Sequence, residues 1–187
     1  MTLHSDTRRF WLYRGLRLLV TVVVVHLLVV GAAPHLIMQM LMRGATEQSL
    51  NLHNRAAFPP AVTAASRSVV MPSPDMLYSY CVFDVSGGPV RITANPALSS
   101  YWSVALYGAN SDNFYVINDR RADGQPVDLW LVSEGANPAA HPVPAGSKVV
   151  VAPSKTGFLL MRVLTGDYDA EKATVERARR TLACTQN

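Results

Sequence analysis

The chain has 187 residues, 49% of them hydrophobic, which is enough for one domain and an additional segment. Its formal net charge of +4 is concentrated near the beginning: residues 1–17, with four arginines and one aspartate, carry +3, and residues 43–187 carry only +1. No basic stripe with interleaved aromatic residues follows, so the sequence argues against nucleic-acid binding.

A long apolar segment runs from Leu18 to Met42 without a Lys, Arg, Asp or Glu. At about 1.5 Å per residue, its 25 residues are long enough to cross the ~30 Å hydrocarbon core of a bilayer. The arginines that precede it predict a cytoplasmic N-terminus and a C-terminal part on the opposite side. The alternative is a secretory signal cleaved at Gly31-Ala32-Ala33, but apolar sequence continues to Met42 and favours an uncleaved signal-anchor.

These features divide the chain into four parts. We predict a cytoplasmic basic tail over residues 1–17, a transmembrane helix in contact with the lipid bilayer over 18–42, a stalk or linker over 43–68 and a folded domain over 69–187. The stalk is compatible with a helix only as far as Phe58-Pro59-Pro60, because neither proline can continue one.

The domain shows strand patterns almost throughout. Within the stretch 101–107, Trp102, Val104 and Leu106 alternate with smaller or more polar residues, which is the period of a half-buried strand. Turn residues separate further segments, and the predicted strands are 78–85, 90–94, 101–107, 114–117, 127–132, 148–152 and 158–164. Because no helical pattern lies between them, we expect a mainly β fold, an antiparallel and jelly-roll-like β-sandwich, rather than a parallel sheet.

The end of the chain changes to a helical period. Asp169 is placed to cap a helix, and Val175, Ala178 and Leu182 form one narrow apolar stripe. We therefore predict a C-terminal amphipathic helix that packs on the sandwich.

Three separated motifs lie between residues 69 and 164. They are Asp75-Met-Leu-Tyr78-Ser79, then Phe83-Asp84-Val85-Ser86-x-Gly88-Pro89-Val90, then Tyr101-Trp102-Ser103-Val104-x-Leu106-Tyr107-x-Ala109-Asn110-x-Asp112-Asn113-Phe114. With this spacing the chain resembles the domain-of-unknown-function 1254 family, as a short, membrane-anchored member. The resemblance implies a β-sandwich in bacterial envelope proteins, and hence an inner-membrane anchor with a periplasmic domain. It implies no established activity.

The motifs of known enzyme classes are incomplete. Ser111-Asp112-Asn113 and Lys155-Thr156-Gly157 match two elements of penicillin-recognising serine enzymes, but no serine has a lysine three residues later to activate it. There is no G-x-S-x-G, and the histidines and cysteines are scattered without metal-ligand spacing. The sequence therefore predicts neither a metal nor another cofactor.

Polar turns and aromatic residues supply the candidate ligand-binding residues. Side chains around the turn after the 101–107 strand could hold Ca²⁺ or hydrogen-bond a sugar, although turn capping is the favoured interpretation. Two tyrosines on the face opposite Trp102 could line a groove. The candidate set is Asp75, Tyr78, Tyr101, Tyr107, Asn110, Asp112, Asn113 and Asp119.

Cys81 and Cys184 are the only cysteines, and the predicted topology places both in an oxidising compartment. We predict a disulfide between them that holds the C-terminal helix on the sandwich. The alternatives are two free thiols, with Cys81 buried and Cys184 in a frayed tail, or a bridge from Cys184 to a partner.

The favoured function is non-catalytic: a membrane-anchored periplasmic module that binds an envelope ligand or a partner protein. The alternative is an envelope hydrolase that acts on a glycan or lipid-linked substrate through Asp112 and a second acid. Convergence of Asp75, Asp84, Asp112 or Asp119 in one pocket would favour the hydrolase.

Overall fold

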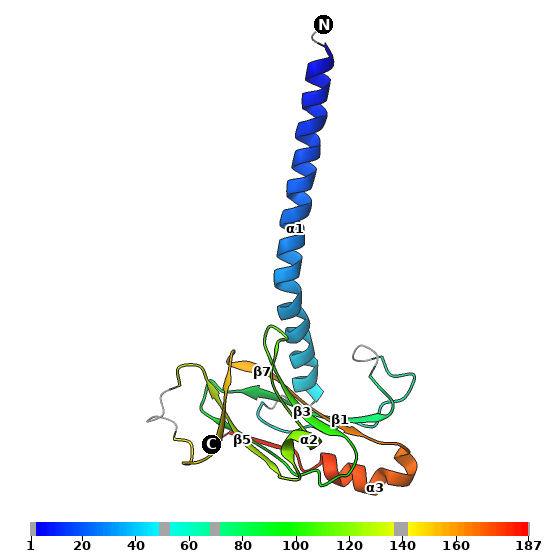
Figure 1. Cartoon of the computed structure of the whole chain (residues 1–187), viewed down its shortest axis with the longest axis vertical. Helices are drawn as coiled ribbons and strands as arrows, with labels where there is room; N and C mark the ends of the chain where they lie inside the picture. The colour runs from blue at the N-terminus through cyan, green and yellow to red at the C-terminus, as the bar shows by residue number, and fades with distance from the viewer. Residues whose placement is uncertain (1–2, 49–52, 68–71, 137–141, 187) are drawn as a thin grey trace.

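The computed structural model describes residues 3–48, 53–67, 72–136 and 142–186. It confirms a mainly β fold that follows one long N-terminal helix, α1 (Leu3–Gln48). Figure 1 shows α1 rising as a single rod from the β domain. Its mean hydropathy reaches 2.4 over an 18-residue window that no other element buries. The helix is thus long and apolar enough to cross a membrane, a property that anchors share with signal sequences.

The β domain consists of two four-stranded sheets. Sheet A has the order β1 (Met76–Asp84), β7 (Thr156–Leu164), β3 (Trp102–Gly108) and β4 (Asn113–Asn118), all antiparallel. Sheet B has the order β6 (Lys148–Ala152), β5 (Val127–Ser133), β2 (Val90–Ala94) and β8 (Ala183–Gln186). All seven predicted strands are present, with ends that differ by up to two residues.

The two sheets share one hydrophobic core. The predicted inward face of the 101–107 strand is confirmed, because Val104 and Leu106 of β3 are completely buried, as are Cys81 and Phe83 of β1. The prediction of a half-buried strand is wrong, since Ser103 and Ala105 on the opposite face of β3 are buried as well. From sheet B, residues of β2 and β5 enter the same cluster, and they are Val90, Ile92, Ala94, Val127, Leu129 and Leu131. The apolar faces of the two sheets therefore bury each other, which is why neither needs a helix over its inner face.

Sheet B departs from the expected antiparallel pattern, because β5 and β6 pair in parallel. Parallel neighbours need a connection of about a dozen residues or more, and residues 134–147 provide one. The prediction of purely antiparallel sheets is therefore wrong for this pair.

The C-terminal region also differs from its prediction. The amphipathic helix α3 (Tyr168–Arg179) is present, but its N-cap is Asp167, whose side chain accepts a hydrogen bond from Ala170 N. Asp169 lies in the first turn instead. The chain then returns to sheet B as β8, so Cys184 lies in a strand and not in a frayed tail.

The C-terminal end of α1 packs directly on the outer face of sheet A. Met38, Met42 and Ala45 are buried against Tyr80 and Val82 of β1, with Phe158 of β7 in the same cluster. The Tyr80 hydroxyl donates a hydrogen bond to the Ala45 carbonyl (3.3 Å). The helix thus contacts the domain with its own side chains and does not merely precede it along the chain.

Residues after α1 cover the free edge of β1. Ala57 exchanges two backbone hydrogen bonds with Tyr80 (2.8 and 3.0 Å), and Asn54 N donates to Val82 O (2.9 Å). Next along this edge, the Arg179 guanidinium donates to Tyr78 O (2.9 Å). An exposed sheet edge is a template for unwanted strand pairing, and these contacts block it.

Candidate functional site

The structure divides the predicted site residues between the two ends of sheet A. The pairs Gly108–Gly157 and Asp84–Thr156 mark one end, and Met76–Leu164 marks the other. Tyr107, Asn110, Asp112 and Asn113 lie at the Gly108 end, whereas Asp75, Tyr78, Tyr101 and Asp119 lie at the Met76 end. The predicted set therefore does not converge in one cleft.

At the Gly108 end, the turn residues bond mainly to one another. Asn110 Nδ2 donates to Asp112 Oδ2 (2.6 Å), and Asp112 N donates to Asn110 Oδ1 (3.2 Å). Asn113 Nδ2 donates to Leu106 O (3.1 Å), and Ser111 has the left-handed φ of 67° that such a turn requires. This geometry is that of a self-capped β3–β4 turn.

The two candidate tyrosines do not form a pair. Tyr107 lies near the end of β3 and packs against the cluster that holds the foot of α1. Tyr101 precedes β3, and its carbonyl accepts a hydrogen bond from Leu164 N (2.9 Å). Six residues of extended chain separate them by about 20 Å, so they cannot line a single small site.

At the Met76 end, four polar residues line up across the strands of sheet A. The registers place Tyr78 beside Arg162, Arg162 beside Ser103, and Ser103 beside Asn118. We call these four residues the Arg162 row. Because side chains two residues apart point to the same face, the row shares the outer face of sheet A with Tyr80 and Leu160 of the α1 contact.

The Arg162 row contains a concentration of unsatisfied polar atoms. In the described part of the chain, Arg162 Nε, Ser103 Oγ and Asp119 Oδ1 are buried without a hydrogen-bond partner. Ser103 is fully buried, and Asp119 is the residue that follows Asn118 of the row. Buried polar groups in proteins almost always have partners, so the two unpartnered atoms of Arg162 and Ser103, on neighbouring residues of the row, need an explanation.

Sequence reasoning does not identify Arg162 or Ser103 as site residues. Each side chain points to the outer face of an otherwise apolar strand, and side chains on such a face are ordinarily exposed to solvent. One sequence signal is available: Phe158 and Leu160 lie on the same face of β7 as Arg162, and apolar residues indicate that this face is not simply exposed to solvent. A polar residue on a strand face that otherwise carries apolar residues is a candidate for a specific role.

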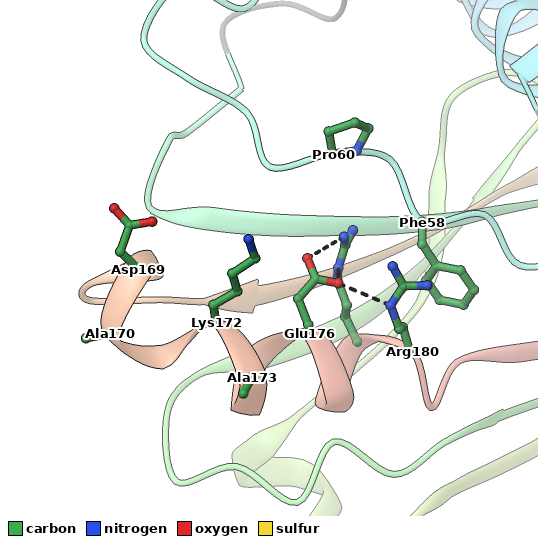
Figure 2. Close-up of a pocket in the computed structure, with 9 residues that line it drawn as sticks. Phe58, Pro60, Asp169, Ala170, Lys172, Ala173, Glu176 and Arg180 are labelled. Carbon is green, nitrogen blue, oxygen red and sulfur yellow. Dashed lines mark hydrogen bonds and ion pairs between the residues drawn. The ribbon is translucent and has the colours of Figure 1, made fainter.

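A shallow groove of about 780 Å³ lies between the segment that follows α1 and helix α3. It is lined by Phe58, Pro60, Asp169, Ala170, Lys172, Ala173, Glu176, Arg179 and Arg180. Figure 2 shows Glu176 beside Arg180, whose guanidinium lies over the Phe58 ring at 5.3 Å. The groove combines side chains of both charge signs with apolar ones such as Phe58 and Pro60.

Glu176 is the centre of a structural network beneath this groove. Its carboxylate pairs with buried Arg179 (2.6 Å) and with Arg180 (3.2 Å), and the Tyr168 hydroxyl donates to it (3.1 Å). Burial raises the pKa of Glu176, but hydrogen bonding and attraction from Arg179, with contributions from Tyr168 and Arg180, outweigh burial and hold the pKa below its ordinary value. The network joins α3 to the β1 edge, because Arg179 also donates to Pro59 O (2.6 Å).

The carboxylates proposed for a hydrolase are not assembled. Asp84 and Asp112 lie at the Gly108 end of sheet A, and Asp75 and Asp119 at the Met76 end. The Asp84 carboxylate accepts hydrogen bonds from the backbone and hydroxyl of Ser86 (2.8 and 2.5 Å). Within the described ranges, no group of three or more His, Cys, Asp or Glu residues is arranged to hold a metal ion.

A family model described as "Protein of unknown function (DUF1254)" matches residues 53–186, which include every strand of both sheets. The chain belongs to the DUF1254 family. The membership confirms the resemblance seen in the three motifs and brings no known reaction with it. A search of curated proteins finds no match.

Two solved structures are similar to this DUF1254 chain. The VPA0106 protein of Vibrio parahaemolyticus has 15% identity and a TM-score of 0.65, with 84% of this chain and 36% of that chain covered. An uncharacterised protein of Burkholderia cenocepacia has 20% identity and a TM-score of 0.43, with 69% and 36% covered. The first similarity supports the fold alone. The DUF1254 chain spans about a third of the length of either solved chain.

Proposed function

We propose that this DUF1254 protein is a single-pass protein of the bacterial inner membrane, with a cytoplasmic N-terminus and a periplasmic sandwich-like domain. The domain binds an envelope ligand or a partner protein and catalyses no reaction. The observation that carries the proposal is the direct packing of α1 on sheet A, because it fixes the domain relative to the helix.

The position of this contact supports a domain that rests on the bilayer. Met38 and Met42 belong to the last turns of the apolar segment Leu18–Met42, and both are buried by sheet A. If the segment spans the membrane, the outer face of sheet A lies at the bilayer surface. Exposed Trp11 and Tyr13 near the other end suit the opposite headgroup layer.

The dispersed carboxylates support binding rather than catalysis. General acid–base hydrolysis needs two acids on either side of one bond. The candidate aspartates lie two at each end of sheet A, and Asp84 and Asp112, which share an end, are each hydrogen-bonded within their own turns. The charged cluster around Glu176 has a structural role, because its hydrogen bonds and ion pairs hold α3 and the β1 edge together.

Topology and partner capture test the proposal together. Protease added to spheroplasts should digest the β domain and spare a tag on the N-terminal tail, and the mature protein should retain the residues before Pro34. Crosslinking of the intact membrane protein, followed by pull-down, should recover an envelope component. A mature protein that begins near Pro34, or a β domain protected in intact spheroplasts but cut after lysis, would contradict the proposal.

A further inference from the structure

We propose that the Arg162 row is a binding site for a phosphate-type anion that also carries hydroxyl groups, of the kind found in a phosphoglycerol headgroup. The inference rests on the proposed function, whose ligand it names by chemical class. Arg162 would hold the anion, and Ser103 and Tyr78 would hold the hydroxyl-bearing part.

The position of the row is the first argument. Arg162 follows Leu160 by two residues on β7, so it lies about 7 Å further along the face on which α1 is docked. Figure 1 shows α1 on one side of the domain and α3 on the other. Arg162 shares the outer face of sheet A with the residues that contact α1, so it belongs to the side that a membrane would face.

The charge of Arg162 is the second argument. Arg91 pairs with Asp128 at 2.6 Å, and Arg179 pairs with Glu176 at 2.6 Å. Arg162 is half-buried, and its Nε is buried without a hydrogen-bond partner among the described residues. A buried guanidinium N–H group without an acceptor is costly, and a phosphate matches the forked donors of an arginine.

The neighbours of Arg162 supply the remaining groups. The Ser103 hydroxyl has no partner, and Tyr78 OH accepts from Ser73 N (2.9 Å), which leaves its own proton free to be donated. Two hydroxyl groups beside a cation suit a ligand that combines an anion with hydroxyl groups.

Ligand access requires a small rearrangement. The unpartnered atoms of Arg162 and Ser103 are covered, whereas the Arg162 side chain as a whole is partly exposed. A rotamer change of Arg162 would uncover its neighbour Ser103 without moving the strands. We therefore expect the anion to bind first to the guanidinium and to carry it away from the sheet.

The experiment measures binding of defined probes to the intact protein in a neutral detergent. Native mass spectrometry would follow phosphatidylglycerol and phosphatidylcholine, and calorimetry would follow glycerol phosphate and inorganic phosphate. The variants are R162Q, S103A and the matched control R177Q, an exposed arginine on α3. All variants keep the arginines that precede the apolar segment, so lipid binding there is common to every sample.

We expect R162Q to weaken binding of phosphatidylglycerol or glycerol phosphate by about tenfold or more, because a charge-assisted pair is lost. S103A should weaken it severalfold, and R177Q should leave it unchanged. Loss seen only with phosphatidylglycerol identifies a lipid headgroup, and loss seen with glycerol phosphate identifies a free anion.

Equal anion binding by R162Q and the unmodified protein would overturn the inference. So would an equal effect of S103A and of the control R177Q on anion binding. A normal thermal melting curve for S103A excludes misfolding as the cause of any loss. Topology and pull-down report on the proposed function separately: a captured partner with no anion binding defeats only this inference. Conversely, anion binding at Arg162 by a protein without a membrane anchor would defeat only the proposed function.

Discussion

Cys81 of β1 and Cys184 of β8 form a disulfide, with their Cα atoms 6.6 Å apart. β1 is an edge strand of sheet A and β8 is an edge strand of sheet B, so the bond joins the two sheets at one margin. The pairing predicted from the sequence is therefore confirmed. Its role differs from the prediction, because it fixes a strand of sheet B rather than the end of a helix.

Removal of this disulfide should cost about 2–5 kcal/mol of unfolding free energy, because the bond closes a loop of 103 residues in the unfolded chain. The measurement is urea unfolding of the intact protein in detergent, with and without reductant. The variant C81A/C184A should match the reduced protein and should not respond to reductant. Two reactive thiols in the denatured, unreduced monomer would show that the bond does not form.

Arg179→Met should destabilise the fold by about 3 kcal/mol. Arg179 is only 2% exposed, and the substitution leaves Pro59 O and Tyr78 O without their donor. The neighbouring Arg177→Met, at an exposed position of the same helix, is the matched control and should stay within about 0.5 kcal/mol. Equal unfolding midpoints for the two variants would contradict a structural role for Arg179.

The ion pair of Glu176 should make stability depend on pH in the acid range. Because its folded pKa lies below the ordinary value of 4.5, ionised Glu176 stabilises the fold above pH 4.5, and this contribution is lost as pH falls through the folded pKa. Glu176→Gln should be less stable than the unmodified protein at neutral pH and should lose less stability on acidification. Exposed Glu134→Gln serves as the control. Parallel pH profiles for both variants and the unmodified protein would refute this assignment.

Asp112→Ala tests whether the β3–β4 turn is structural. The substitution removes the acceptor of the Asn110 Nδ2 bond, and it should cost about 1 kcal/mol or less at this exposed position. For the variant and for the unmodified protein alike, the melting temperature in calcium should equal that in chelator. A calcium-dependent rise in melting temperature that disappears in the variant would instead indicate a metal site.

The strands could be predicted because their pattern is contained within each segment. Cys81 and Phe83 alternate inward whatever β1 pairs with, and the same holds for Val104 and Leu106 of β3. β8 has only four residues and obtains its strand conformation from pairing with β2, where Cys184 lies opposite Ile92. The sequence therefore predicts the cysteine pairing, which depends on composition and compartment, but not the strand that carries it.

The candidate site depends on strand order, which is not local. Arg162 and Ser103 become neighbours because β7 lies between β1 and β3. Hydrophobic periodicity and turn residues do not determine this strand order. The turn around Asp112 was accessible to sequence reasoning because its partners lie within four residues. Self-contained polar turns can thus be recognised in the sequence, whereas polar groups whose neighbours come from other strands cannot.

The docking of α1 beside Cys81 has a mechanical consequence. Tyr80 bonds to Ala45 of the helix and to Ala57 of the segment after it, and the next residue is covalently tied to β8. Tension between the helix and the domain would enter β1 at Tyr80 and pass through the Cys81–Cys184 bond into sheet B. Both sheets would then bear the load together, and β1 could not be pulled away before the rest of the domain.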